Sequence, residues 1–270
     1  MTIRPTVVAA LCAALACVGA VTGCAQTNAA GPASSPGSHR AAAGSHRTAA
    51  GSPATPGSSG ALDGCLTAAS GRVESAPDAG GGTMPVGIVG SGQRVIILSN
   101  ESDEDLCSWI PFARRLAAAG YRTVLWDYAA GPQTDELRGL VRWLRASGAK
   151  KIVLMGASEG AKVSIIAAAT GRTAPSGVVS LSAEQVLLPA IAVITSVRRL
   201  HCPLLLVTAA GDPYGSAQAA RGFMKAAPGP DKQLVTVRGA DHGTALLSGS
   251  AARTVVPAVL AFLGHVLRTR

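Results

Sequence analysis

The residue best placed for chemistry is Ser158, in the sequence Gly156-Ala157-Ser158-Glu159-Gly160. The mostly apolar residues 151–155 precede this motif, and the helix-forming residues 161–169 follow it. A buried strand that turns sharply through G-x-S-x-G into a helix exposes the serine hydroxyl at the corner of the turn. Side chains at the two glycine positions would clash with the neighbouring strand and helix. Because glycine is abundant in this chain, the flanking strand and helix, more than the motif alone, predict that Ser158 is a nucleophile.

Two further residues complete a candidate set for nucleophilic catalysis, in the chain order Ser, Asp, His. A serine hydroxyl is a poor nucleophile until a base removes its proton. His242 lies in the sequence Gly239-Ala240-Asp241-His242-Gly243, where small neighbours leave the imidazole free to reach a serine. The other histidines lie in the N-terminal segment, before a predicted strand or in the terminal helix, so His242 is the predicted base.

The predicted acid is Asp212, which follows the apolar residues 204–209 in the sequence Gly211-Asp212-Pro213-Tyr214. A carboxylate at this point can hold the imidazole in one tautomer and stabilise its cation. Asp-Pro is also a common turn pair, and in that interpretation Asp212 would only begin a turn. Glu184, after the apolar residues 178–181, is the alternative acid.

Negative charge that develops on a substrate oxygen is stabilised by backbone N–H donors, normally two of them. The first predicted donor is Glu159, which follows the nucleophile at the positive end of the next helix. The second is expected from the loop Ser99-Asn100-Glu101-Ser102, with the N–H of Glu101 preferred and that of Asn100 as second choice.

The elements that must position these residues alternate between strands and helices from Arg94 onward. Continuous short apolar runs suit strands buried on both faces of a parallel sheet, and they occur at 95–98, 123–126, 152–155, 178–181, 204–207 and 234–237. Helical patterns occupy 109–119, 134–147, 161–170, 187–199, 216–226 and 251–267. This order predicts the α/β class, with a doubly wound, mostly parallel sheet and helices on both faces. Residues 67–89 are expected to add antiparallel edge strands.

Ligands of such a sheet bind at the carboxyl ends of its strands, and Ser158, Asp212 and His242 each follow a predicted strand. Only about twenty residues separate Leu181 from Leu204, and one helix is expected to use them. The sequence therefore predicts a rather open site without a lid domain.

The first sixty residues are predicted to lie outside this domain. Arg4 and the apolar residues 7–18 are typical of a secretory signal, which ends in Val21-Thr22-Gly23-Cys24, similar to the lipobox of bacterial lipoproteins. Residues 1–23 are therefore predicted to be a lipoprotein signal peptide, and Cys24 is predicted to carry a lipid anchor. The alternative is an ordinary secretory signal with a chance cysteine.

Residues 24–60 contain mainly Ala, Gly, Ser, Pro and Thr. Such a segment buries too little apolar surface to offset its ordering entropy, so it is predicted to be a disordered linker. Residues 61–270 are long enough for one domain with a full core. The predicted location is extracytoplasmic, at the bacterial cell membrane through the lipid anchor.

The net charge of +9, from 24 basic and 15 acidic residues, occurs without a basic run or basic residues interleaved with aromatics. We therefore expect no nucleic-acid partner.

Three cysteines lie in the predicted domain: Cys65, Cys107 and Cys202. An oxidising compartment favours one disulfide. Cys107 lies past the carboxyl end of its strand and Cys202 before the amino end of another, so roughly 17–20 Å of strand would separate them. Because a disulfide needs Cα atoms within about 7 Å, the pair Cys107–Cys202 is disfavoured, and Cys65 must be one partner. We prefer Cys65–Cys107, with Cys65–Cys202 as the alternative. Cys202 would then be a buried, unreactive thiol.

Residues 94–270 resemble the α/β-hydrolase family, in the lidless form close to dienelactone hydrolase and small bacterial carboxylesterases. The resemblance rests on the motifs around Ser158, Asp212 and His242, and on the sequences Trp109-Ile110-Pro111-Phe112-Ala113 and Gly120-Tyr121-Arg122-Thr123-Val124.

The chain departs from the family pattern at two sites. The chain has Ser99-Asn100 where the family often has His-Gly, which implies a stiffer oxyanion loop. Glu159 beside the nucleophile is also less usual, and its carboxylate is expected to repel anionic substrates.

The resemblance implies a serine hydrolase of the carboxylesterase type, acting on a small-molecule ester or related acyl substrate. Ser158 would attack, His242 would shuttle the proton and Asp212 would orient His242, with no metal and no organic cofactor. Two alternatives stay open: a cell-envelope acyltransferase with the same triad, and a catalytically silent binding lipoprotein.

Overall fold

The computed structural model describes residues 62–129, 131–188 and 190–268, which belong to one compact unit of residues 55–270. The predicted signal peptide, Cys24 and the predicted linker lie outside the described residues. These parts of the sequence interpretation therefore stay predictions.

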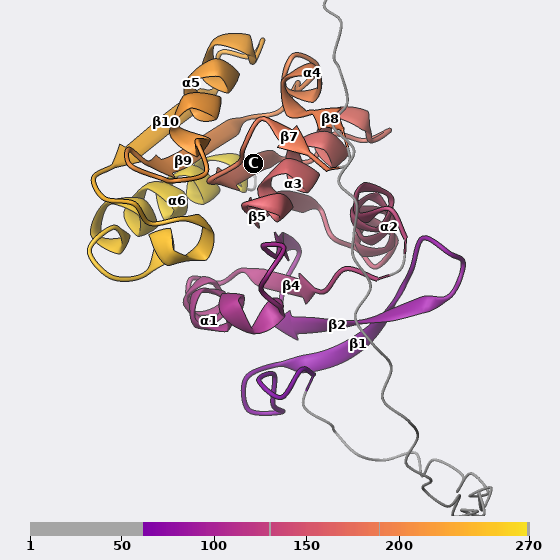
Figure 1. Ribbon diagram of the computed structural model, residues 1–270. Helices are drawn as coiled ribbons and strands as arrows, with labels where there is room; N and C mark the ends of the chain where they lie inside the picture. The colour runs from indigo at the N-terminus through magenta and orange to yellow at the C-terminus, as the bar shows by residue number, and fades with distance from the viewer. Residues whose placement is uncertain (1–61, 130, 189, 269–270) are drawn as a thin grey trace, which may run out of the picture. The chain divides into compact units, whose positions relative to one another are not determined.

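An eight-stranded sheet runs through the centre of the described domain (Figure 1). In spatial order its strands are β1 (Arg72–Pro77), β2 (Thr83–Val89), β4 (Arg122–Trp126), β3 (Arg94–Ser99), β5 (Lys151–Ala157), β6 (Gly177–Leu181), β9 (Leu204–Ala209) and β10 (Lys232–Val237). β1, β2 and β4 pair in antiparallel fashion, and all neighbours from β4 to β10 are parallel. The six predicted parallel strands and the expected antiparallel edge strands are confirmed.

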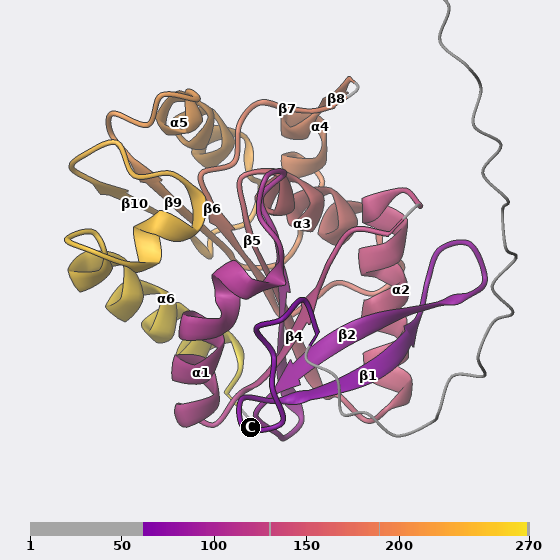
Figure 2. The ribbon, with the colours of Figure 1, turned by 60° about the horizontal axis from the view of Figure 1, so that its bottom comes forward.

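Helices cover both faces of the sheet (Figure 2). One face carries α1 (Ile110–Ala118) and α6 (Ala252–Val266), and the other carries α2 (Gln133–Ala146), α3 (Glu159–Thr170), α4 (Val193–Val197) and α5 (Ser216–Ala226). The predicted doubly wound α/β class is therefore confirmed. In the described parts of the chain, no helix is both long and apolar enough to cross a membrane.

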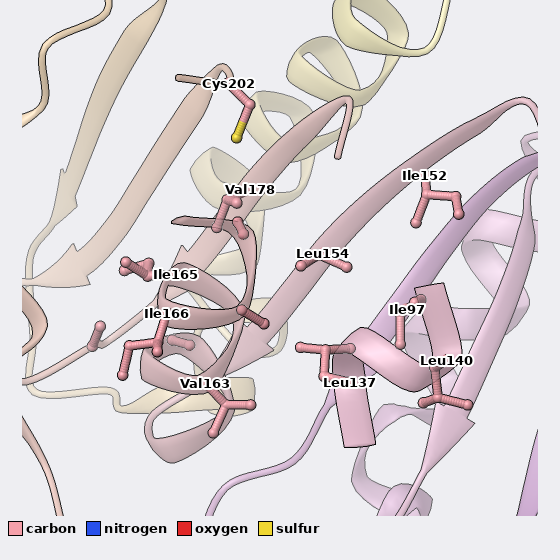
Figure 3. Packing of buried hydrophobic residues seen from close by; sticks show 14 of the residues in the cluster. Ile97, Leu137, Leu140, Ile152, Leu154, Val163, Ile165, Ile166, Val178 and Cys202 are labelled. Atoms are coloured by element: carbon pink, nitrogen blue, oxygen red, sulfur yellow. The ribbon is translucent and has the colours of Figure 1, made fainter. Parts of the chain in front are cut away.

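The central strands are covered on both faces, so nearly all of their residues are buried and most are apolar, with buried polar exceptions such as Ser180 on β6 and Thr208 on β9. In β3, Val95 and Ile97 pack into the core under α2 and α3, whereas Ile96 and Leu98 pack into the core under α1 and α6. Figure 3 shows the first of these cores, where side chains of the strands meet those of the helices. Each fully buried residue of this size contributes about 1.5–3 kcal/mol, so the strand ends that carry the loops are held firmly.

The segment between β6 and β9 differs from the prediction of one helix over 187–199. Two short antiparallel strands, β7 (Val186–Leu187) and β8 (Ile191–Ala192), precede the five-residue helix α4. The helix prediction is wrong over the first half of the segment. Pro189 in this stretch of the sequence has no N–H for a helical hydrogen bond, which favours a hairpin. The described residues of this segment form only β7, β8 and α4 and no lid domain.

A disulfide joins Cys65 to Cys107, whose Cα atoms lie 5.7 Å apart, so the preferred pairing is confirmed. Cys202 is free and buried as expected, and burial raises the pKa of its thiol to about 11. The disulfide spans 42 positions of sequence and contributes on the order of 4 kcal/mol by chain entropy. It fastens the start of the domain to the short helix η1 (Leu106–Trp109), directly after the predicted oxyanion loop.

Candidate active site

Ser158 lies at the sharp corner between β5 and α3. Its φ of 49° and ψ of −110° form a strained backbone conformation for a residue with a side chain. A Cβ atom at Gly156 would lie 2.1 Å from the carbonyl oxygen of Gly160, and one at Gly160 would lie 2.1 Å from the carbonyl oxygen of Ser99. The predicted reason for the two glycines is confirmed, because α3 approaches β5 and β3 too closely for side chains there.

His242 and Asp212 come together at the carboxyl ends of β10 and β9. His242 Nδ1 lies 2.8 Å from Asp212 Oδ2. The hydroxyl of Ser216 donates to the same carboxylate oxygen at 2.5 Å, and the N–H of Tyr214 donates to Asp212 Oδ1 at 2.9 Å. The sequence analysis did not identify Ser216, although its position four residues after Asp212 at the start of α5 suits such a contact.

These contacts keep Asp212 ionised. Burial by itself raises the pKa of the Asp212 carboxyl, but hydrogen bonds from Ser216, His242 and the N–H of Tyr214, together with the charge of His242, outweigh burial and lower the pKa below its ordinary value. The carboxylate accepts the N–H of Nδ1, which leaves Nε2 of the neutral ring without a proton. A general base needs this tautomer.

Glu184 lies on the opposite side of the imidazole from Asp212. The Ser158 hydroxyl donates to Glu184 Oε1 at 3.0 Å, and His242 Nε2 lies 3.5 Å from the same oxygen. Lys162 of α3 forms an ion pair with Glu184 Oε2, and both side chains are largely buried. The geometry therefore favours Asp212 over Glu184 as the acid behind the histidine. The sequence analysis missed Lys162, whose signal was its position one helical turn after the nucleophile.

The two predicted oxyanion donors, Glu101 and Glu159, lie next to the residues through which the loop after β3 contacts the start of α3. The N–H of Gly160 donates to the carbonyl oxygen of Asn100 at 2.9 Å, and the hydroxyl of Tyr128 donates to the same oxygen at 2.6 Å. The N–H groups of Glu101 and Glu159 have no acceptor among the described residues. Both N–H groups are therefore available to a substrate oxygen, and their role stays a prediction.

The loop of Glu101 is tied directly to the loop of His242. Glu101 Oε1 accepts hydrogen bonds from the N–H and the hydroxyl of Thr244, each at 2.7 Å. Between the two loops, Gly243 has a φ of +54°, and a Cβ atom there would lie 2.1 Å from Glu101 Oε2. The buried Glu101 carboxylate thus holds the loop of His242 against the loop of Glu101, a contact that the sequence analysis did not predict.

A second carboxylate supports the oxyanion loop from behind. The side-chain amide of Asn100 donates to the carbonyl oxygen of Trp126 at 3.1 Å and to Asp127 Oδ1 at 2.5 Å, and the N–H of Leu106 donates to the same Asp127 oxygen at 2.8 Å. Burial and the neighbouring Asp63 carboxyl raise the pKa of Asp127 to about 7, against the opposing effect of the Leu106 and Asn100 donors. Asp127 therefore titrates near neutral pH.

Asp127→Asn should flatten part of the pH dependence of folding stability. The folded protein holds the Asp127 proton more tightly than the unfolded chain, in which the pKa is about 4. Wild-type stability should therefore fall as pH rises from about 4 to the folded pKa of about 7, and this contribution should then level off. Urea unfolding at pH 4.5, 6 and 7.5 measures the difference. Asp103→Asn, at an exposed position in the same loop region, is the matched control. An unchanged slope in the Asp127 variant would contradict the raised pKa.

The described residues contain no group of three or more His, Cys, Asp or Glu side chains that could hold a metal ion. The charged groups around Ser158 include Asp212, Glu184, Lys162 and the titratable His242. Glu159 follows Ser158 directly, and its carboxylate accepts a hydrogen bond from the side-chain amide of Gln133.

No protein-family model and no curated protein matches this sequence. Among solved structures, an esterase of Pyrococcus furiosus has a TM-score of 0.66 and 14% identity, covering 73% of this chain and 91% of its own. A dienelactone hydrolase of Anabaena variabilis has a TM-score of 0.60 and 19% identity, covering 74% and 100%. A monoacylglycerol lipase of Paleococcus ferrophilus has a TM-score of 0.58 and 14% identity, covering 67% and 98%. At these identities the likeness concerns the fold, and together with the order and layers of the sheet it shows that the chain has the α/β-hydrolase fold.

Proposed function

We propose that this protein is an envelope-anchored serine hydrolase that cleaves carboxylic esters or related acyl bonds. One observation carries the proposal: His242 Nδ1 lies 2.8 Å from Asp212, and Nε2 lies 3.5 Å from the oxygen that accepts the Ser158 hydroxyl. The similar solved structures named above are an esterase, a dienelactone hydrolase and a lipase, which supports hydrolytic chemistry on this fold.

The first step is a rotation of the Ser158 side chain. In the structure its hydroxyl donates to Glu184 Oε1, and His242 Nε2 lies beside the same oxygen. A change of the Ser158 rotamer moves the hydroxyl from Glu184 towards Nε2. Such rotations are fast compared with turnover, so the resting contact with Glu184 does not prevent activation.

In the chemical step, His242 Nε2 takes the hydroxyl proton while Ser158 Oγ bonds to the carbonyl carbon of the ester. The N–H groups of Glu159 and Glu101 stabilise the oxyanion. Asp212 and Glu184 then lie on either side of the imidazolium and stabilise its positive charge. The imidazolium gives its proton to the leaving alcohol, and water attacks the acyl-enzyme by the same route to release the acid and restore Ser158.

The ring of Tyr214 supports a substrate with an apolar group. It is 66% exposed, and its centre lies 4.5 Å from that of the His242 ring. An exposed aromatic ring beside the base offers a contact surface for the alcohol or acyl part of an ester.

Labelling with a fluorophosphonate probe tests the proposal. We expect the full chain to form a covalent adduct on Ser158, located by peptide mapping, and Ser158→Ala to remain unlabelled. Ser147→Ala, at an exposed serine after α2, is the matched control and should label like the wild type. An adduct on another serine, or no adduct on folded protein, would overturn the assignment of this site.

Cys24→Ser should move the protein from the membrane to the soluble fraction with its esterase activity intact. The expectation follows from the proposed anchor on Cys24 and from the location of Ser158, Asp212 and His242 in a separate domain. Cell fractionation with immunoblotting measures it, and Cys17→Ser, inside the predicted signal, is the control that should stay membrane-bound. Membrane retention of the Cys24 variant would indicate an uncut signal helix instead of a lipid anchor.

A further inference from the structure

A pocket of about 540 Å³ lies between α2 and α3, far from the proposed nucleophile. α3 begins beside Ser158 and ends 12 residues later at Thr170 on the pocket wall, which corresponds to about 18 Å along the helix. The volume lies within the usual range for small-molecule sites. The proposed reaction makes no use of this pocket.

Four arginines and no acidic residue line the pocket. Arg138, Arg142 and Arg145 occupy one face of α2, and Arg172 follows α3. Like charges spaced in this way along a helix repel one another, so their gathering on one face is unfavourable without an anion. Arg142 and Arg172 are exposed, and neither has a hydrogen-bond or ion-pair partner among the described residues.

The other two guanidinium groups are held in the wall. Arg138 forms an ion pair with Asp135 and donates to the hydroxyl of Thr170 at 2.7 Å. Arg145 Nη2 donates to the carbonyl oxygen of Ala174 at 3.1 Å, while its Nε is buried without an acceptor among the described residues. The pocket thus combines two guanidinium groups in fixed positions, those of Arg138 and Arg145, with two that can reorient to bind a ligand, those of Arg142 and Arg172.

The inner wall of the pocket is apolar. It is formed by Val141, Leu154, Ala167 and Ala168; Val141 is half-buried, whereas Leu154 on β5 (Figure 3) and the two alanines are almost fully buried. These side chains offer nothing to a charged group and suit a hydrocarbon chain. The pocket therefore has a positively charged rim and an apolar floor.

We propose that this pocket binds a single-chain anionic amphiphile, an alkyl chain that ends in a phosphate or a carboxylate. Guanidinium groups bind both kinds of head in bidentate fashion, and the alkyl chain would lie against half-buried Val141 and the aliphatic stems of the lining arginines. The site is distinct from Ser158 and does not depend on the proposed hydrolytic activity.

Titration calorimetry on the full chain tests this proposal with octyl phosphate as the probe. We expect octyl phosphate to bind at one site. Octanoate has the same chain length with a carboxylate head, and we expect it to bind at the same site. Inorganic phosphate should bind at least about tenfold more weakly, because it lacks the chain, and octyltrimethylammonium should not bind at this site. Equal affinity for inorganic phosphate would overturn the proposal in favour of a plain anion patch. Binding to anionic phosphatidylglycerol vesicles without binding to octyl phosphate would overturn it in favour of a membrane contact.

The double variant Arg142→Gln/Arg172→Gln tests whether octyl phosphate binds in this pocket. Both side chains lack described partners, so the variant should fold normally, lose octyl phosphate binding by about tenfold or more and hydrolyse esters at the wild-type rate. Arg221→Gln, an exposed arginine on α5, is the matched control. Unchanged octyl phosphate affinity in the double variant would place the ligand elsewhere and overturn the proposal. Because binding is measured without turnover, failure of this proposal and failure of the proposed function give separate results.

Discussion

Ser158→Ala should remove hydrolysis of short p-nitrophenyl esters by a factor of about 10⁴ or more, with the fold intact. The hydroxyl is the proposed nucleophile, and its removal leaves only binding and oxyanion stabilisation. His242→Ala should cost about as much, because nucleophile and base act as a unit and their losses are not additive. Initial rates, with circular dichroism to verify folding, measure both effects.

The double variant Ser158→Ala/His242→Ala sharpens this experiment. If the two residues act as a unit, the double variant should be about as slow as either single variant. Substantial residual activity in Ser158→Ala would remove the hydrolase assignment from this site.

Asp212→Asn should slow ester hydrolysis by about 10⁴, whereas Glu184→Gln should stay within about tenfold of the wild type. An asparagine amide can donate to His242 Nδ1, which would place the ring proton on Nε2 and abolish the base. A glutamine at position 184 can still accept the Ser158 hydroxyl, and it loses only the charge that faces Lys162 and the imidazolium. Values of kcat/KM for the two variants give the ranking.

The matched control for Glu184→Gln is Lys162→Met/Glu184→Gln, which removes both charges. The single variant leaves Lys162 buried without its partner, so it should unfold at lower urea than the double variant. This comparison separates lost stability from lost catalysis. The reverse ranking, with Glu184→Gln far slower than Asp212→Asn, would transfer the acid role to Glu184.

The sharp turn at Ser158 and the strands were predictable because their signals are local. The Ser158 turn is specified by the two glycines within two positions of it and by the strand and helix on either side. Strand ends in a parallel sheet lie at one edge, so Asp212 and His242 could be expected near Ser158 without knowledge of their rotamers. The same geometry excluded a Cys107–Cys202 disulfide, whereas the choice of Cys107 over Cys202 as the partner of Cys65 was a preference that the structure confirms.

The contacts that refine the site were not predictable, because they join residues that are distant in sequence. Glu101 and Thr244 are 143 positions apart, and nothing in the pattern around either residue indicates the other. The contact of Glu184 with Ser158 likewise joins residues 26 positions apart. The hairpin of β7 and β8 was also missed, and Pro189 inside an apparently helical pattern was the available signal for it.

The bridge from Glu101 to Thr244 limits how the proposed active site can be redesigned. Any residue larger than glycine at position 243 would meet the Glu101 carboxylate, and any shortening of Glu101 would release Thr244. Substrate scope on the oxyanion side and placement of the base therefore share one set of positions. In a library that varies position 101 alone, most variants would lose activity because His242 is displaced. Joint variation of positions 101, 243 and 244 is the smallest change that can alter acyl preference and keep the proposed base in place.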